Sequence, residues 1–269
     1  NMITRIKQYL SYRFEKSIVL HLYNRNSLYS KLIKYLLIKI FNWHNHKIEK
    51  ADEVYQYFDN SNRTLFYTRK SRVIRYKNGI ERKLNSLQQE YRTNNLILPE
   101  YSSIIDIGAN IGEFSMFWED RNFNVISFEP EELEFKALQR NLKSNDIYNF
   151  GLWHENCTLK FYHSNETGDS SFIKGNTNDN YSELLVKTLD SFSFYQEHTI
   201  GLIKLEAEGA EPEIIKGGIE TFKRAHFVTC DVGLERGFNN SSTIVEVTSL
   251  LSNIGFEMIQ FNPTRYITV

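Results

Sequence analysis

The sequence predicts an α/β protein with a Rossmann-like sheet of seven strands, mostly parallel and with the last strand antiparallel. From Ser103 onward, short apolar runs alternate with amphipathic segments of helical periodicity. A glycine-containing turn follows the first apolar run, and Glu129 closes the second. Strands that alternate with helices in this way form a parallel sheet covered by helices on both faces.

Each element of this domain has its own signal. Helices are predicted after Gly112, around residues 135–142, from Pro212 onward through Ile215, Ile219 and Phe222, and over residues 244–254, where apolar residues recur at helical spacing. Residues 165–180 are rich in Gly, Ser, Asn and Asp, so we expect a loop there, and loops of this length are often functional. Strands are predicted at 104–107, 125–128, 148–153, 159–162, 200–205, 226–232, 256–261 and 265–269.

Residues 1–100 are predicted to form an extension to this domain, which spans residues 101–269. Residues 2–45 have helical periodicity, with an apolar stripe from Leu32 to Ile40 flanked by lysines. Residues 73–77 and 80–84 flank Asn78-Gly79, a pattern typical of a β-hairpin with a two-residue turn. The sequence therefore predicts a helical and β-ribbon extension.

Charge distinguishes the two parts. Residues 1–100 contain 19 Lys and Arg against 8 Asp and Glu, whereas the remainder contains 13 against 25. The helix predicted within the basic residues 2–45 is expected to pack against the rest of the protein as a cap, to form a homo-oligomer interface, or to lie on an anionic membrane surface. Nucleic acid is not an expected partner, because no base-reading module is recognisable and charge alone gives non-specific attraction.

The chain is expected to be cytoplasmic, with a peripheral position at the inner membrane face if the basic helix binds lipid. Cys157 and Cys230 are too few for a disulfide framework and lack metal-ligand spacing. The first twenty residues contain no uninterrupted apolar stretch of a secretory signal. The most apolar run, 32–41, is much shorter than the roughly 20 apolar residues that span a bilayer.

The strongest motif is Asp106-Ile107-Gly108-Ala109-Asn110-Ile111-Gly112, followed at the end of the next strand by Phe128-Glu129-Pro130. Glycines allow a tight turn and close approach of a ligand to the backbone, and the helix that follows presents unpaired N–H groups. A carboxylate that closes the second strand is placed to accept hydrogen bonds from both ribose hydroxyls. Glu129 is the candidate for this role.

The same turn favours S-adenosylmethionine over a nicotinamide dinucleotide. A G-x-G-x-x-G loop serves a pyrophosphate, whereas this turn reads Gly-Ala-Asn-Ile-Gly and lacks the third glycine. The amino-acid end of S-adenosylmethionine needs an acceptor for its ammonium and donors for its carboxylate, which Asp106 and the turn amides around Asn110 can supply. The alternative is that Asp106 satisfies loop N–H groups and the glycines mark an ordinary turn.

At this point the chain resembles the FkbM family of S-adenosylmethionine-dependent methyltransferases, which have the class I methyltransferase fold. The resemblance rests on the two motifs above, on Thr188-Leu189-Asp190, and on the segment 203–211, Ile-Lys-Leu-Glu-Ala-Glu-Gly-Ala-Glu. In relatives this segment has aspartate where Glu206 stands, and the next strand commonly ends in glutamate where this chain has Asp231. The resemblance implies O-methylation of a hydroxyl, and a carbohydrate acceptor in surface polysaccharide biosynthesis is expected.

Methylation of a hydroxyl requires a base that takes up its proton. Glu206, Glu208, Asp231 and His154 are the candidates near the strand ends, and Lys204 is placed to tune a neighbouring carboxylate. Glu208 and Glu211 precede a helix, so stabilising that helix is an alternative role for them, and His154 is alternatively a surface histidine. No metal is expected, because the acids lie on different strand ends without ligand spacing.

Two other functions remain open from the sequence. The domain could methylate a small secondary metabolite instead of a glycan. It could also bind the cofactor or a partner without turnover, if Glu206 in place of aspartate has abolished catalysis.

Overall fold

The computed structural model describes residues 47–61, 63–164, 170–175, 180–192, 199–262 and 266–268, with four isolated helical positions, 14, 17, 35 and 39. The chain divides into two compact units, residues 1–83 and 84–269, a boundary earlier than the predicted one at residue 100. Most of the helix predicted over residues 2–45 lies outside the described residues. Within the part of the chain that is described, no helix is long and apolar enough to cross a membrane.

The first unit contains a three-stranded antiparallel sheet. Its strands are β1 (Lys47–Ala51), β2 (Val54–Phe58) and β3 (Thr64–Tyr67), paired in that order and followed by the 3₁₀ helix η1 (Lys70–Tyr76). Tyr57, Tyr67 and Tyr76 are fully buried, and the Tyr57 hydroxyl donates to the main-chain oxygen of Tyr76 at 2.8 Å. The buried phenol thus keeps a hydrogen-bond partner inside an aromatic core.

The prediction of a β-hairpin over residues 73–84 is wrong. Residues 70–76 form η1, and the second half of the expected hairpin is the start of helix α3 (Ile80–Glu90). Gly79 does adopt a positive φ of 92°, but the turn leads into a helix whose first amide, that of Ile80, donates to Asp59 Oδ2 at 3.2 Å. Buried residues recur here at helical spacing, at Ile80, Leu84, Gln88 and Tyr91. The prediction of a strand over residues 80–84 overlooked this spacing.

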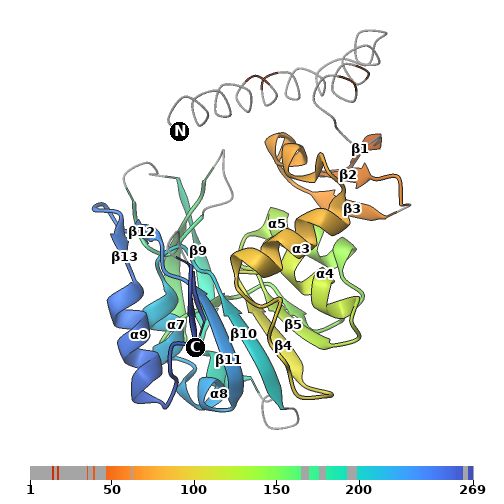
Figure 1. Cartoon of the computed structure of the whole chain (residues 1–269). Helices are drawn as coiled ribbons and strands as arrows, with labels where there is room; N and C mark the ends of the chain where they lie inside the picture. The colour runs from red at the N-terminus through yellow and green to blue at the C-terminus, as the bar shows by residue number, and fades with distance from the viewer. Residues whose placement is uncertain are drawn as a thin grey trace, which may run out of the picture. The chain divides into compact units, whose positions relative to one another are not determined.

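The second unit is built on a seven-stranded sheet of order β14-β15-β11-β10-β4-β5-β6 (Figure 1). Five neighbouring strands pair in parallel, and β15 pairs antiparallel with both β11 and β14, so β15 alone among the seven runs in the opposite direction. This arrangement confirms the predicted Rossmann-like, mostly parallel sheet. The strands are β4 (Ser103–Ile107), β5 (Asn124–Phe128), β6 (Ile147–Tyr148), β10 (Ile200–Leu205), β11 (Ala225–Asp231), β14 (Gln260–Phe261) and β15 (Tyr266–Thr268).

The strand order fixes where a ligand can bind. From β4 the chain moves outward through β5 to β6, and it later returns to the other side of β4 as β10. The order of the sheet therefore reverses between β4 and β10, and in open α/β sheets ligands bind outside the carboxyl ends of the strands at such a point.

Helices cover both faces of this sheet. Helices α4 (Glu113–Glu119) and α5 (Glu132–Asn141) lie on one face, and α7 (Glu211–Lys216), α8 (Ile219–Lys223) and α9 (Ile244–Asn253) lie on the other (Figure 1). The alternation along β4 explains this: Ile105 and Ile107 join the core beneath α7–α9, while Asp106 faces α4 through Ser115. The α4 face therefore carries the polar residues of the strand ends.

A separate three-stranded sheet accounts for several differences from the predicted strands. The run 148–153 is split between β6 and β7 (Gly151–Leu152), and β8 (Cys157–Tyr162) pairs with β9 (Tyr181–Lys187), a strand that was not predicted. Only the end of the run 256–261 is a strand. The remaining strands are β12 (Leu234–Arg236) and β13 (Ser241–Ser242), and of the predicted loop 165–180 the structure describes residues 170–175 and 180.

The helix predicted after Pro212 is two short helices, α7 and α8, separated by Gly217-Gly218. A Cβ at Gly217 would lie 2.0 Å from the main-chain oxygen of Trp153, so this close approach excludes a side chain. Asp190 supplies a new start to α8 by accepting hydrogen bonds from the amides of Glu220 at 3.0 Å and Thr221 at 2.8 Å. The apolar stripe was correct, but the break between the helices depends on tertiary contacts.

Candidate functional site

A tight turn connects β4 to α4 at the carboxyl edge of the sheet. Gly108, Asn110 and Gly112 have positive φ values of 71°, 53° and 89°. The amides of Gly108 and Ala109 both donate to the main-chain oxygen of Phe128, at 3.0 and 2.9 Å, which ties the turn to the end of β5. A Cβ at Gly112 would lie 2.7 Å from Leu138 Cδ1, so α5 packs closely against the turn.

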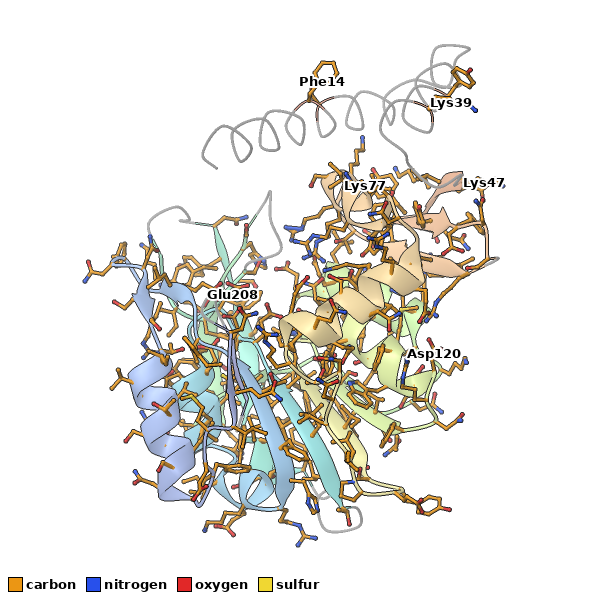
Figure 2. All side chains as sticks on the ribbon, in the orientation of Figure 1. Phe14, Lys39, Lys47, Lys77, Asp120 and Glu208 are labelled. Carbon is orange, nitrogen blue, oxygen red and sulfur yellow. The ribbon has the colours of Figure 1, made fainter. Side chains whose placement is uncertain are left out.

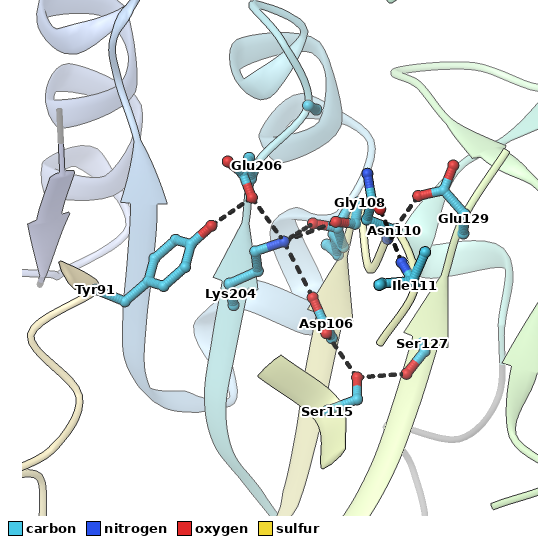
Figure 3. Close-up of polar contacts among 12 residues, drawn as sticks. Tyr91, Asp106, Gly108, Asn110, Ile111, Ser115, Ser127, Glu129, Lys204 and Glu206 are labelled. Carbon is cyan, nitrogen blue, oxygen red and sulfur yellow. Dashed lines mark hydrogen bonds and ion pairs between the residues drawn. The ribbon is translucent and has the colours of Figure 1, made fainter. Parts of the chain in front are cut away.

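Glu129 lies directly against this turn. Its carboxyl group accepts a hydrogen bond from the amide of Asn110 at 2.7 Å (Figure 3) and another from the amide of Glu131 at 2.8 Å. Burial raises the pKa of Glu129 to about 8, and the nearby Glu134 and Glu131 add to the shift. The neighbouring Pro130 is held by the side-chain amide of Asn149, which donates to its main-chain oxygen at 3.2 Å.

Lys204 joins the two strands on either side of the reversal point. It lies opposite Asp106 in the register of β10 and β4, and its ammonium is 3.2 Å from both Asp106 Oδ1 and Glu206 Oε2. It also donates to the main-chain oxygen of Gly108 at 2.7 Å (Figure 3). Burial favours the neutral amine, but the two carboxylates outweigh it and hold the pKa of Lys204 above its ordinary value. Lys204 is therefore a buried cation between two carboxylates, and its tuning of either one stays a prediction.

Asp106 is fully buried between β4 and α4. Its Oδ2 accepts a hydrogen bond from Ser115 Oγ at 2.6 Å, and Ser115 Oγ lies 2.9 Å from Ser127 Oγ. Its other oxygen faces Lys204. Both oxygens of Asp106 thus have contacts within the protein. That Asp106 accepts a hydrogen bond from the cofactor ammonium stays a prediction. In the structure, Asp106 contacts Lys204, which in turn donates to the turn at Gly108.

Glu206 begins the segment after β10 and is the most accessible carboxylate of this cluster, with 27% of its side chain exposed. Its amide donates to the main-chain oxygen of Ile107 at 3.2 Å, which fixes its backbone beside the turn. Its Oε2 accepts a hydrogen bond from the hydroxyl of Tyr91 as well as facing Lys204 (Figure 3). A partly exposed carboxylate thus stands beside the glycine turn, oriented by a phenol and an ammonium.

Sequence reasoning missed Tyr91. It follows α3, is buried, and packs edge-on against Phe114 with ring centroids 5.4 Å apart. A helical interpretation of residues 80–90 would have placed Tyr91 on a buried face with Ile80 and Leu84, but not beside Glu206.

The other predicted acids have different surroundings. Glu208 has a positive φ of 50°, and its main-chain oxygen accepts a hydrogen bond from Ser171 Oγ at 2.8 Å. The segment around Ser171, described at residues 170–175, therefore lies against this carboxyl edge, where Figure 2 shows Glu208. Asp231 is buried at the end of β11, and its Oδ1 accepts from the amide of Gly233 at 2.9 Å.

Glu211, the first residue of α7, holds the bend that precedes this helix, and its alternative role of stabilising the helix stays a prediction. Its Oε1 accepts hydrogen bonds from the amides of Ala207 at 2.9 Å and Gly209 at 3.0 Å, within the bend that follows β10. Burial raises its pKa to about 7. His154 is largely exposed and lies 3.7 Å from Glu155, which agrees with a surface histidine.

Among the residues that the structure describes, no group of three or more His, Cys, Asp or Glu side chains is arranged to hold a metal ion.

Fold and site together define a class of protein. A glycine turn, a buried acid that closes the adjacent strand, and an accessible carboxylate meet at the reversal point of a Rossmann-like sheet, an arrangement that suits an enzyme binding a nucleoside-containing cofactor. Residues 106–258, more than half of the 269, match the model of the methyltransferase FkbM domain. The chain therefore belongs to the FkbM methyltransferase family, and the predicted family and methyltransferase class are confirmed.

Two curated relatives are fungal methyltransferases. The chain is 28% identical over 159 residues to methyltransferase sdnD of Sordaria araneosa, covering 45% of this chain and 61% of that protein. It is 24% identical over 147 residues to methyltransferase 1 of Beauveria bassiana, covering 44% and 59%. The chain thus aligns with about three-fifths of the length of these relatives.

Among solved structures, magnesium protoporphyrin IX methyltransferase from Synechocystis PCC 6803 with bound S-adenosylmethionine aligns with 70% of this chain and 77% of its own. The TM-score is 0.38 and the identity 10%.

Proposed function

We propose that this chain is an S-adenosylmethionine-dependent O-methyltransferase whose acceptor is a hydroxyl group of a carbohydrate. The observation that carries the proposal is Glu206, a partly exposed carboxylate beside the glycine turn. A hydroxyl loses a proton when it is methylated, and a positioned carboxylate accepts that proton. Family membership supports S-adenosylmethionine as the methyl donor.

The residues at the carboxyl edge fit this cofactor. A carboxyl group keeps acceptor lone pairs whether it is protonated or ionised, so the two amide contacts of Glu129 leave capacity for hydrogen bonds with ribose hydroxyls. The turn around Gly108 and Asn110 is free of any phosphate-binding glycine pattern, in agreement with a cofactor that lacks phosphate. When bound, S-adenosylmethionine supplies an electrophilic methyl group.

The protein's own residues then have distinct tasks. Glu129 holds the ribose, and Asn110 and Pro130 shape the wall of the site beside it. Glu206 orients the acceptor hydroxyl and takes up its proton. Lys204 and Asp106 hold the end of β10 against the turn, which keeps Glu206 close to the cofactor. Glu208 and Asp231, at the same edge, are the alternative bases.

The carbohydrate acceptor and a role in surface polysaccharide biosynthesis are the finer part of the proposal and rest on the family resemblance. A screen with radiolabelled donor tests them directly, with glycans in one panel and hydroxylated secondary metabolites in the other. Methylation of a glycan that falls at least 100-fold in Glu206→Gln supports the proposal. Transfer to the metabolite panel alone replaces the acceptor class, and donor binding without transfer to either panel supports the non-catalytic alternative.

A further inference from the structure

We propose that Tyr91 is the positioning residue of the base, fixing the Glu206 carboxylate and favouring its ionised form. This inference rests on the proposed function and adds a residue to it.

Two donors meet at a single oxygen of Glu206. The Tyr91 hydroxyl donates to Oε2, and the Lys204 ammonium lies 3.2 Å from the same atom (Figure 3). Tyr91 is 2% exposed and Lys204 3%, whereas 27% of the Glu206 side chain is exposed. The carboxylate is therefore held from its buried side and reaches solvent on the side where an acceptor can approach.

Tyr91 is itself fixed at both ends. Its main-chain oxygen accepts a hydrogen bond from Thr229 Oγ1 of β11 at 2.8 Å, and its ring packs against Phe114 of α4. The ring also lies beside Lys204, with the ammonium 5.6 Å from the ring centroid. A phenol anchored to two elements orients Glu206 without a large loss of side-chain entropy when an acceptor binds.

The charges around Glu206 explain why a neutral donor matters. Asp106 on β4 shares Lys204 with Glu206, and Glu211 on α7, Asp231 on β11 and Glu206 all interact electrostatically with the buried thiol of Cys230. These acids disfavour a further negative charge, and Lys204 is shared between Asp106 and Glu206. A hydrogen bond from Tyr91 to the ionised carboxylate favours that form without adding charge.

The test is Tyr91→Phe, which retains the ring packing and removes the hydroxyl. Carboxyl-¹³C glutamate labelling follows Glu206 by NMR, with Glu206→Gln identifying its signal. We expect the titration midpoint of Glu206 to rise by about one pH unit, and the acid limb of kcat/KM to move in the same direction. Tyr101→Phe, at a 94% exposed tyrosine, is the matched control and leaves both unchanged.

An unmoved titration midpoint in Tyr91→Phe, whatever the rate of that variant, would overturn the inference. If Tyr91→Phe does not fold, fluorotyrosine at position 91 keeps the packing and strengthens the donor, so the midpoint is expected to fall; an unchanged midpoint overturns the inference. The NMR titration requires no methyl transfer. An enzyme that shows the shift but methylates nothing therefore refutes the proposed function and not the Tyr91–Glu206 contact.

Discussion

The main-chain oxygen of Glu206 lies only 1.8 Å from the position that a Cβ would take on Gly108. The ends of two neighbouring parallel strands therefore touch through their backbones at the reversal point of the sheet. The turn that is proposed to hold the cofactor and the carboxylate that is proposed to act as base form one structural unit.

Gly108→Ala is expected to disrupt that unit. The methyl group collides with the Glu206 backbone, and the φ of 71° alone costs about 1–2 kcal/mol for a residue with a Cβ. We expect a loss of more than about 3 kcal/mol of unfolding free energy, measured by urea denaturation. The control is Gly255→Ala, whose φ is 104° but whose Cβ meets no atom within 4 Å, so only the backbone strain is added.

Asp190 of the Thr188-Leu189-Asp190 motif is expected to matter for stability and not for cofactor binding. Besides the two amides at the start of α8, its carboxylate accepts a hydrogen bond from Thr221 Oγ1 at 2.6 Å. Asp190→Ala should lower the unfolding free energy by about 1–2 kcal/mol, with donor affinity unchanged in calorimetry. Asp190→Asn, which keeps one acceptor oxygen, should lose less, and a larger effect on affinity than on stability would contradict this role.

Lys204→Met should be strongly destabilising because it leaves Asp106 buried without its cation. Loss of one partner of a buried ion pair costs about 3–5 kcal/mol. The double variant Asp106→Asn with Lys204→Met removes both charges and should recover much of that loss. Thermal denaturation of the two single variants and the double variant measures the coupling, and strictly additive effects would refute it.

Glu211 gives the protein a specific pH dependence. Its folded-state pKa of about 7 is above the ordinary value of 4.5, so between these values the folded protein retains a proton that the unfolded chain releases. Its contribution to stability is therefore lost as pH rises from about 4.5 to about 7. The neutral side chain of Glu211→Gln resembles the protonated acid and does not titrate. As pH rises from 5 to 8, the unfolding free energy of this variant should therefore increase by about 1–3 kcal/mol relative to that of the wild type. Equal differences at both pH values in urea denaturation would contradict the assignment.

The parallel sheet was predictable because its signals are local. Strands such as β4 and β10 are fully buried and therefore largely apolar, the polar exceptions being Ser103, Asp106 and Lys204. The glycine turn and Glu129 were predictable for the same reason, since each follows a buried strand directly. The hairpin at 73–84 failed because Asn78-Gly79 is compatible with a turn into either a strand or a helix, and Asp59, distant in sequence, caps the helix.

The glycine turn and Glu129, the proposed cofactor side of the site, lie together as the sequence predicts, whereas Tyr91 was not expected beside Glu206. Tyr91 is 115 residues from Glu206 in the sequence, and no spacing rule connects a residue after a helix to one after a later strand. The buried state of Asp106 also depends on the register of β4 with β10, which places Lys204 beside it. Such contacts arise from the three-dimensional fold and leave no periodic trace in the sequence.

The most direct test of the account is calorimetric titration of the wild type and of Glu129→Ala with S-adenosylhomocysteine. Glu129→Gln and a thermal melt of each variant separate binding from folding, because the carboxylate also holds the amides of Asn110 and Glu131. We predict micromolar binding by the wild type and a loss of about 10- to 100-fold in Glu129→Ala, the effect of removing the hydrogen-bond partner of the ribose hydroxyls. Unchanged affinity in a folded Glu129→Ala, or no binding by the wild type, would contradict the proposed cofactor site.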